Sequence, residues 1–163
     1  MLGFLKKNNN VLELFAPMDG EIIDITNVED QVFSKKMVGD GIAIIPTDGL
    51  VVAPCDGKIL QIFSTNHAVG IETKEGLEIL IHLGLDTVEL KGEGFTRLAE
   101  TGMEVKTGDP LIKMDLERIK ELGKSTVSPV LITNVSRTEE IKKEYGPAKA
   151  KSTRIMSVKV KNS

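Results

Sequence analysis

The sequence contains no tryptophan, one tyrosine and one cysteine, and it has no apolar run long enough to span a bilayer. The single Cys55 excludes an internal disulfide and a cysteine-rich metal site, which favours an intracellular protein. No segment has the charged start, apolar core and cleavage site of a signal peptide, so we expect a cytoplasmic location. A formal net charge of -3 leaves no basic field for nucleic acid, and we expect no nucleic-acid partner.

A chain of 163 residues suits one compact domain that buries most of its unfolded surface. We expect this domain over residues 13–163, preceded by a flexible N-terminal segment over residues 1–12. The first ten residues combine apolar side chains with two lysines and an asparagine run, which also fits a short amphipathic foot on a membrane. Because the segment is too short for strong interfacial binding, we expect peripheral membrane contact at most.

Short β-branched runs separated by turn residues fill the chain from Phe15 onward, a pattern typical of an all-β protein. We therefore expect an antiparallel β sandwich, or a barrel-like variant of it, with short helical segments. Helical periodicity appears at residues 115–122, where Asp115 can cap the helix, and more weakly at residues 139–145. The predicted strands are Glu21–Ile25, Gly41–Pro46, Leu50–Ala53, Gly57–Phe63, Ala68–Glu72, Glu78–Leu83, Leu111–Met114, Ser128–Thr133 and Met156–Lys161.

The chain contains an internal repeat: residues 16–25 (APMDGEIIDI) are similar in sequence to residues 53–62 (APCDGKILQI). Each copy predicts a proline-initiated turn, in which Asp-Gly provides backbone freedom, followed by an alternating strand. Biotinyl and lipoyl carrier domains have similar repeated halves, but Lys58 follows its turn and lacks the methionine that accompanies the lysine of those carriers. Cys55 takes the place of Met18, so we expect a small buried apolar side chain there.

The chain has only two histidines, and both lie in strand-like segments. His82 interrupts the apolar run of residues 77–86, and His67 lies fifteen residues upstream. Two antiparallel strands and their turn cover that distance, so pairing of the strands would bring the imidazoles together. A neutral imidazole has a nucleophilic nitrogen near pH 7, and it can carry a covalently attached group when an acceptor such as the Gly84 carbonyl holds its other nitrogen.

Spacing alone leaves other interpretations of the histidines open. It favours two ordinary strand residues, each satisfied by a local hydrogen bond. A zinc site needs more ligands than two histidines, such as a carboxylate from a partner protein. A Ser-His-Asp triad is disfavoured because no Gly-x-Ser-x-Gly motif occurs, and the glycine clusters at residues 39–41 and 92–94 lack the strand-then-helix setting of nucleotide loops.

Four segments carry a family resemblance: residues 33–47, residues 65–68 (TNHA), residues 81–95, which include IHLGLD, and residues 108–111 (GDPL). In order and spacing they resemble the glucose-family IIA component of the bacterial phosphoenolpyruvate-dependent sugar phosphotransferase system. The resemblance extends from about Phe15 to the C-terminus and implies an antiparallel β sandwich with short helices. Members occur alone or fused to membrane permease domains, and this chain resembles the free-standing form.

The resemblance implies a phosphoryl relay, in which the small carrier HPr donates to the IIA component and a cysteine of the IIB domain of a IICB-type sugar permease accepts. His82 matches the accepting histidine, through Nε2, with Nδ1–H directed at the Gly84 carbonyl. His67 matches a histidine that hydrogen-bonds the phosphoryl oxygens, and Thr65 matches the hydroxyl that orients it. No cofactor is implied, since phosphoryl transfer depends mainly on alignment and electrostatic stabilisation. A zinc ion at His67 and His82 would need a partner's carboxylate and is not predicted for the isolated chain.

The resemblance also implies a docking surface for HPr and the IIB domain. Asp30 and Asp86 match acidic residues that border the site, where they would meet positive groups of the donor. Apolar side chains would surround the histidines, although periodicity alone assigns most of them to the core. These apolar residues are Val32, Phe33, Met37, Val38, Phe63, Leu80 and Val88.

A second function fits the same resemblance: a regulatory binding module that docks on permeases or metabolic enzymes according to its phosphorylation state. The retained His67 and His82 favour a working relay. The sequence leaves the transported sugar open, because the membrane component selects it. Residues 146–154 are more basic than the family pattern leads us to expect, which leaves the regulatory contacts open as well.

Overall fold

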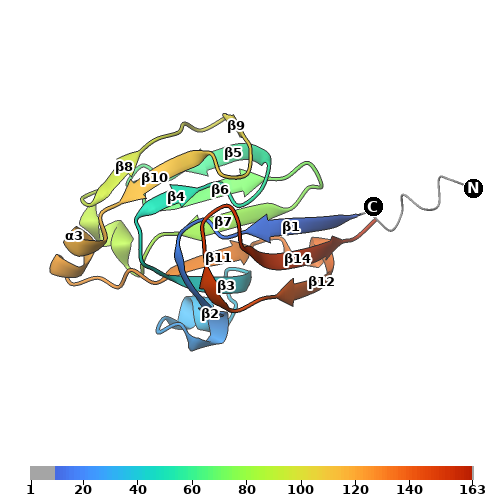
Figure 1. The fold of residues 1–163 in the computed structure, drawn as a ribbon, viewed down its shortest axis with the longest axis horizontal. Helices are drawn as coiled ribbons and strands as arrows, with labels where there is room; N and C mark the ends of the chain where they lie inside the picture. Colours follow the sequence, from blue (N-terminus) through green and yellow to red (C-terminus); the bar gives the residue numbers. More distant parts are fainter. Residues whose placement is uncertain (1–9, 163) are drawn as a thin grey trace, which may run out of the picture.

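The computed structural model describes residues 10–162, which form three antiparallel sheets (Figure 1). The largest sheet has the strand order β13-β2-β3-β11-β7-β6-β5-β9, and the smaller sheets have the orders β1-β14-β12 and β4-β10-β8. The expected all-β, antiparallel architecture is therefore confirmed. The strands are β1 (Val11–Phe15), β2 (Gly20–Asp24), β3 (Asp40–Pro46), β4 (Leu50–Val52), β5 (Gly57–Ile62), β6 (Ala68–Glu72), β7 (Glu78–His82), β8 (Phe95–Arg97), β9 (Glu104–Val105), β10 (Pro110–Met114), β11 (Ser128–Ile132), β12 (Thr138–Lys143), β13 (Gly146–Ala148) and β14 (Arg154–Val160).

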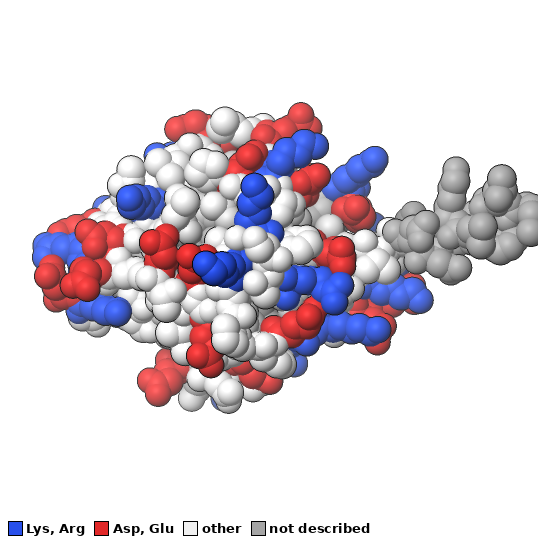
Figure 2. All heavy atoms as spheres, viewed as in Figure 1, with Lys and Arg blue, Asp and Glu red and all other residues white. Residues whose placement is uncertain are grey.

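Five short helical pieces connect the described strands. The α-helix α3 lies at the end of the molecule opposite the C-terminus in Figure 1. Acidic and basic side chains intermix over the face drawn in Figure 2. Between residues 10 and 162, no helix is both long enough and apolar enough to cross a membrane. The helical pieces are η2 (Ile25–Asn27), α2 (Gln31–Ser34), η3 (Thr87–Leu90), α3 (Leu116–Glu121) and η4 (Val135–Arg137).

Alternation along the strands gives the largest sheet two different faces. In β7, Ile79 and Ile81 are buried in the main core between the sheets, whereas Leu80 and His82 are partly exposed. Successive side chains of a strand point to opposite faces, so His82 lies on the face turned away from the main core. An apolar strand can therefore carry a histidine on its outer face without opening the core.

A second apolar cluster covers part of this outer face. It is formed largely by the chain between β2 and β3, residues 25–39, which we call the α2 segment. Phe33 of this segment is buried in the cluster together with Ala43 of β3 and Leu131 of β11. The α2 segment is thus packed against the same face of the sheet that carries His82.

The internal repeat has a structural role, as its turn chemistry suggested. The side chain of Asp19 accepts a hydrogen bond from the Ala150 backbone N–H at 2.8 Å, and that of Asp56 accepts one from the Thr107 N–H at 2.9 Å. Each Asp-Gly turn therefore holds a distant loop through the same kind of contact. Cys55 is buried in the main core, which confirms the prediction of a small buried side chain.

The predicted helix at residues 139–145 is wrong, because Thr138–Lys143 form strand β12, which pairs antiparallel with β14. The Thr138 hydroxyl donates to the Val135 carbonyl at 2.7 Å instead of capping a following helix. The other helix prediction is confirmed, since the side chain of Asp115 accepts from the Arg118 N–H at the start of α3.

Each predicted strand overlaps an observed one, but β1, β8, β9, β12 and β13 were not predicted. Most of the segment expected to be flexible, residues 1–12, lies outside the described part of the chain. Val11 and Leu12 belong to β1, so the folded region begins before the expected residue 13.

Candidate active site

The two histidines meet on the outer face of the largest sheet. β6 begins directly after His67 and β7 ends at His82, and the two strands pair so that Ala68 lies opposite His82. The imidazole centroids are 5.2 Å apart, and the ring planes form an angle of 77°. The pairing of strands that the fifteen-residue spacing predicted therefore brings both rings into one site.

The His82 ring is fixed by the backbone two residues further on. Its Nδ1 lies 2.8 Å from the Gly84 carbonyl oxygen, which can only accept, so Nδ1 carries the proton. The Nε2 atom then keeps its lone pair. Gly84 has a φ of 80°, and a Cβ at this position would lie 2.7 Å from the Ser125 carbonyl oxygen, so no other residue fits.

The pKa of His82 is lowered, mainly by burial. The hydrogen bond to the Gly84 carbonyl and the charges of Asp30 and Asp86 raise it, but by less. The ring is therefore neutral at pH 7. A neutral imidazole with a free Nε2 lone pair is a nucleophile. The site can thus form a covalent bond at this nitrogen.

His67 is almost completely buried and contacts the Thr65 hydroxyl, with 2.5 Å between Oγ1 and Nδ1. Burial, and secondarily the neighbouring His82, lower the pKa of His67 to about 4, so this ring is neutral as well. With the hydroxyl as donor, Nδ1 accepts and the ring proton lies on Nε2. In that tautomer His67 offers a hydrogen-bond donor beside the His82 nucleophile.

Aromatic rings from two other segments contact the imidazoles. Phe33 of the α2 segment lies against His82 with a centroid distance of 4.9 Å, and Phe63, which follows β5, meets His67 edge-on at 5.4 Å. These contacts limit the orientations that the imidazoles can adopt.

The two expected acidic residues border the site. The Asp30 side chain caps α2 by accepting the Val32 N–H at 2.9 Å, and Asp86 stands just before η3 in a left-handed backbone conformation. Both carboxylates raise the pKa of His82, as expected of negative charges near that ring. The rim of the site is therefore acidic.

The seven apolar residues expected around the site divide by exposure. Phe33 is buried, as periodicity alone predicts. Val38, Phe63 and Leu80 are partly buried. The other three are exposed and leave apolar surface open at the α2 segment and at η3; they are Val32 (44%), Met37 (71%) and Val88 (52%).

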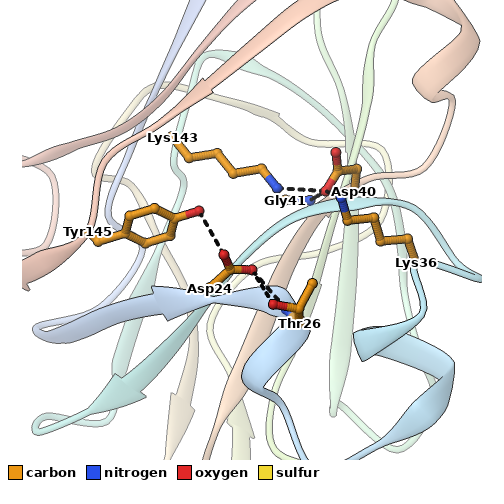
Figure 3. Close-up of polar contacts among 7 residues, drawn as sticks. All are labelled: Asp24, Thr26, Lys36, Asp40, Gly41, Lys143 and Tyr145. Atoms are coloured by element: carbon orange, nitrogen blue, oxygen red, sulfur yellow. Dashed lines mark hydrogen bonds and ion pairs between the residues drawn. The ribbon is translucent and has the colours of Figure 1, made fainter.

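The α2 segment is held at both of its ends by residues at the end of β12 and just after it (Figure 3). At the start, Asp24 accepts from the Tyr145 hydroxyl at 3.5 Å. At the end, Asp40 accepts from Lys143 Nζ at 2.7 Å, and Lys36 of the segment lies 3.6 Å from the same oxygen. β12 and the turn that follows it therefore hold the segment whose Phe33 contacts His82.

Sequence reasoning missed two residues that hold the chain next to His82. The Ser128 hydroxyl of β11 accepts the Gly84 N–H at 3.1 Å, and the buried Thr87 hydroxyl donates to the Leu83 carbonyl at 2.6 Å. Ser128 lies 44 residues from Gly84, and no local motif marks such a partner. Among residues 10–162, no group of three or more His, Cys, Asp and Glu side chains is placed to hold a metal ion.

Comparisons with known proteins agree on one family. The sequence model described as "phosphoenolpyruvate-dependent sugar phosphotransferase system, EIIA 1" matches residues 12–138. The "PTS system glucose-specific EIIA component" of Borreliella burgdorferi is 47% identical over 158 residues, which cover 96% of this chain and 84% of that protein. The protein of the same name from Bacillus cereus is 49% identical over 158 residues, with 96% of each chain covered. Among solved structures, glucose permease IIA from Mycoplasma capricolum superposes with a TM-score of 0.85 at 39% identity, covering 92% of this chain and 97% of that one.

Proposed function

This chain belongs to the EIIA 1 family of the phosphoenolpyruvate-dependent sugar phosphotransferase system, and we propose that it carries the phosphoryl group of that system on Nε2 of His82. The family assigns the chain to the phosphoryl carriers of sugar uptake. The observation that supports His82 as the carrier atom is its fixed tautomer, with Nδ1–H on the Gly84 carbonyl and the Nε2 lone pair free. We assign this role to the folded region as a single IIA domain in the cytoplasm.

The proposed partners are HPr as donor and the IIB domain of a sugar permease as acceptor. In the first step the Nε2 lone pair of His82 attacks phosphorus, and the bond between phosphorus and the HPr atom that carries it breaks with its electron pair returning to that atom. In the second step a IIB cysteine thiolate attacks, and the pair of the N–P bond returns to His82 Nε2. Neither step needs a further reactant, because each exchanges one bond to phosphorus for another.

The neighbouring residues would assist by alignment. The Nε2–H of His67 would donate to a phosphoryl oxygen, and Thr65 keeps the proton on that nitrogen by donating to Nδ1. Asp30 and Asp86 would attract basic side chains of the donor, and the exposed Val32, Met37 and Val88 would give both partners apolar contact area.

The test is labelling of the purified chain by radioactive phosphoenolpyruvate with enzyme I and HPr. We expect acid-labile, alkali-stable label on the wild type and none on His82→Gln. A His82→Gln protein that still takes up label would refute the assignment. The matched variant is His67→Gln, which should accept label but pass it slowly to a IIB domain, whereas a normal onward rate would remove His67 from the proposed mechanism.

A further inference from the structure

Several proposed site residues belong to one tight turn between β5 and β6, residues 63–67, which we call the His67 turn. Its Asn66 N–H donates to the Phe63 carbonyl at 2.7 Å, and the Phe63 N–H donates to the Ala68 carbonyl at 3.0 Å. Asn66 adopts a left-handed conformation with a φ of 59°, which asparagine tolerates better than most residues that carry a side chain. Thr65 and His67 flank Asn66, so the backbone conformation of Asn66 sets how the two hydrogen-bonded side chains are placed relative to each other.

Arg97 holds the His67 turn from a different sheet. It is the last residue of β8, which pairs with β10 in a three-stranded sheet, whereas the turn joins two strands of the largest sheet. Its Nε donates to Asn66 Oδ1 at 2.8 Å, and its Nη2 donates to the carbonyl oxygen of Phe63 at 3.2 Å and lies 3.5 Å from that of Ile62. One side chain thus binds the left-handed residue and the first residue of the turn.

Only arginine has the geometry for this set of contacts. The guanidinium is planar and presents its N–H groups in a rigid fork, so it reaches several oxygens in one orientation. The side chain of Arg97 is 29% exposed, and its charge is balanced by Glu100, 3.5 Å away at the surface. A lysine presents its three donors from one nitrogen, without the rigid fork that lets one guanidinium bind the Asn66 side chain and the Phe63 carbonyl in a fixed orientation.

We propose that Arg97 is a positioning residue for His67: by holding Asn66 and Phe63 it fixes the His67 turn, and with it the Thr65–His67 hydrogen bond and the tautomer of the His67 ring. The hydrogen-bond partners of Arg97 include neither imidazole, so Arg97 acts on His67 through the turn. The expected effect on phosphoryl transfer rests on the proposed function of His67. The expected effect on the tautomer of the His67 ring does not depend on that function.

The experiment compares Arg97→Gln and Arg97→Lys with Arg154→Gln, an arginine of β14 that binds only exposed carboxylates. The first readout is the ¹⁵N spectrum of the two imidazoles in the full chain, which distinguishes a single His67 tautomer from an average of two. The second is the rate of phosphoryl acceptance from phospho-HPr and of onward transfer to a IIB domain. The melting temperature of each variant separates a general loss of stability from a local change.

We expect the Arg97→Gln spectrum to show averaged His67 tautomers and an unchanged His82 ring. This variant should still accept the phosphoryl group from phospho-HPr. Its onward transfer to the IIB domain should be slower by roughly tenfold or more, because small misplacements at a reacting centre reduce rates by this much. Arg97→Lys should show the same ring signature even if Arg97→Gln folds poorly, and Arg154→Gln should match the wild type. A wild-type His67 spectrum in both Arg97 variants would overturn the proposal. The ring readout needs no phosphoryl transfer, so it decides the role of Arg97 even if His82→Gln refutes the proposed function.

Discussion

At the scale of the residue, burial decides the chemistry of both histidines. The ordinary imidazole pKa of about 6.5 would leave each ring partly protonated near neutral pH. Burial is the first cause of the lowered pKa at both His67 and His82. Both rings are therefore kept in the neutral form, which is the form that the proposed phosphoryl transfer requires of each.

The lowered pKa of His67 predicts an acid-sensitive fold. Its value of about 4 lies below the 6.5 of the unfolded chain, so between these pH values the unfolded state binds a proton that the folded state does not. The free energy of unfolding should therefore fall as the pH decreases from about 6.5 to about 4, with His67 contributing about 2 kcal/mol of loss between pH 7 and pH 5. Urea titrations of the wild type and of His67→Gln at both pH values measure the difference.

Asp24 contributes little to this comparison. The pKa of Asp24 is lowered by its hydrogen bonds to the Thr26 backbone and hydroxyl, so this group stays ionised throughout the window. The same loss of stability in His67→Gln and in the wild type would show that His67 is not the titrating group.

The meeting of His67 and His82 was predictable from their spacing, because paired antiparallel strands fix which residues lie opposite each other. The hydrogen bond from His82 to Gly84 was also predictable, since it spans two residues. Arg97 and Ser128 were not, because each reaches the site from a strand far away in sequence. Local sequence patterns carry the short-range contacts of the site and omit those that tertiary packing supplies.

At the scale of the element, the α2 segment is held next to the site by an ion pair with Lys143, a residue distant in the sequence. Lys143 Nζ and Asp40 Oδ1 are 2.7 Å apart, and the side chains are only 15% and 20% exposed. Lys143→Met keeps most of the aliphatic stem but removes the hydrogen bond of Asp40 to Lys143, and Asp40 keeps only the more exposed Lys36 as a charge partner. Loss of this hydrogen bond to a charged group should destabilise the fold by about 1–3 kcal/mol in urea unfolding. We also expect the KM for phospho-HPr to rise by up to about tenfold, because roughly 1.4 kcal/mol of binding free energy would be spent on ordering the segment.

The control for this prediction is Lys159→Met. Its ion pair with Glu139 spans 3.9 Å between half-exposed side chains, so its loss should change stability by less than about 1 kcal/mol. Equal effects of the two variants on stability and on KM would contradict a special role for Lys143.

The wrong helix at residues 139–145 has a physical reason at the same scale. Glu139, Glu140, Lys142 and Lys143 are good helix formers, and the preceding residues resemble a capping box. In the fold, this stretch instead pairs with β14, whose outer backbone groups would otherwise lack partners. Pairing across the sheet thus outweighed a helix propensity worth only a few tenths of a kcal/mol per residue.

At the scale of the whole molecule, one main core joins all three sheets. It contains Leu14 of β1, Ile112 of β10 and Ile81 of β7, each from a different sheet and each fully buried. A site on the outer face of the largest sheet is therefore carried by a platform whose packing does not depend on the site. This separation explains why a strand pattern typical of a core could also hold His82.

Cys55 lies in this shared core and provides a natural probe of its opening. It is the single cysteine of the chain and is only 2% exposed, and burial, followed by the charges of Glu75 and Asp56, raises the pKa of its thiol to about 12. Thiol reagents attack the thiolate, so the folded protein should react at least about a thousandfold more slowly than the urea-unfolded chain. The exposed control is Lys74→Cys in a Cys55→Ser background, which should react at the rate of an open thiol without urea.

The dependence of the rate on urea then shows how much of the molecule must open. If the three sheets unfold as one unit, the logarithm of the Cys55 labelling rate should rise with urea with the same slope as the equilibrium unfolding curve. A rate independent of urea, or one close to that of the Lys74→Cys control, would mean that the turn at residues 53–57 opens locally. In that case Cys55 labelling would report the opening of this turn alone, and the expectation that the three sheets unfold as one unit would lose its support.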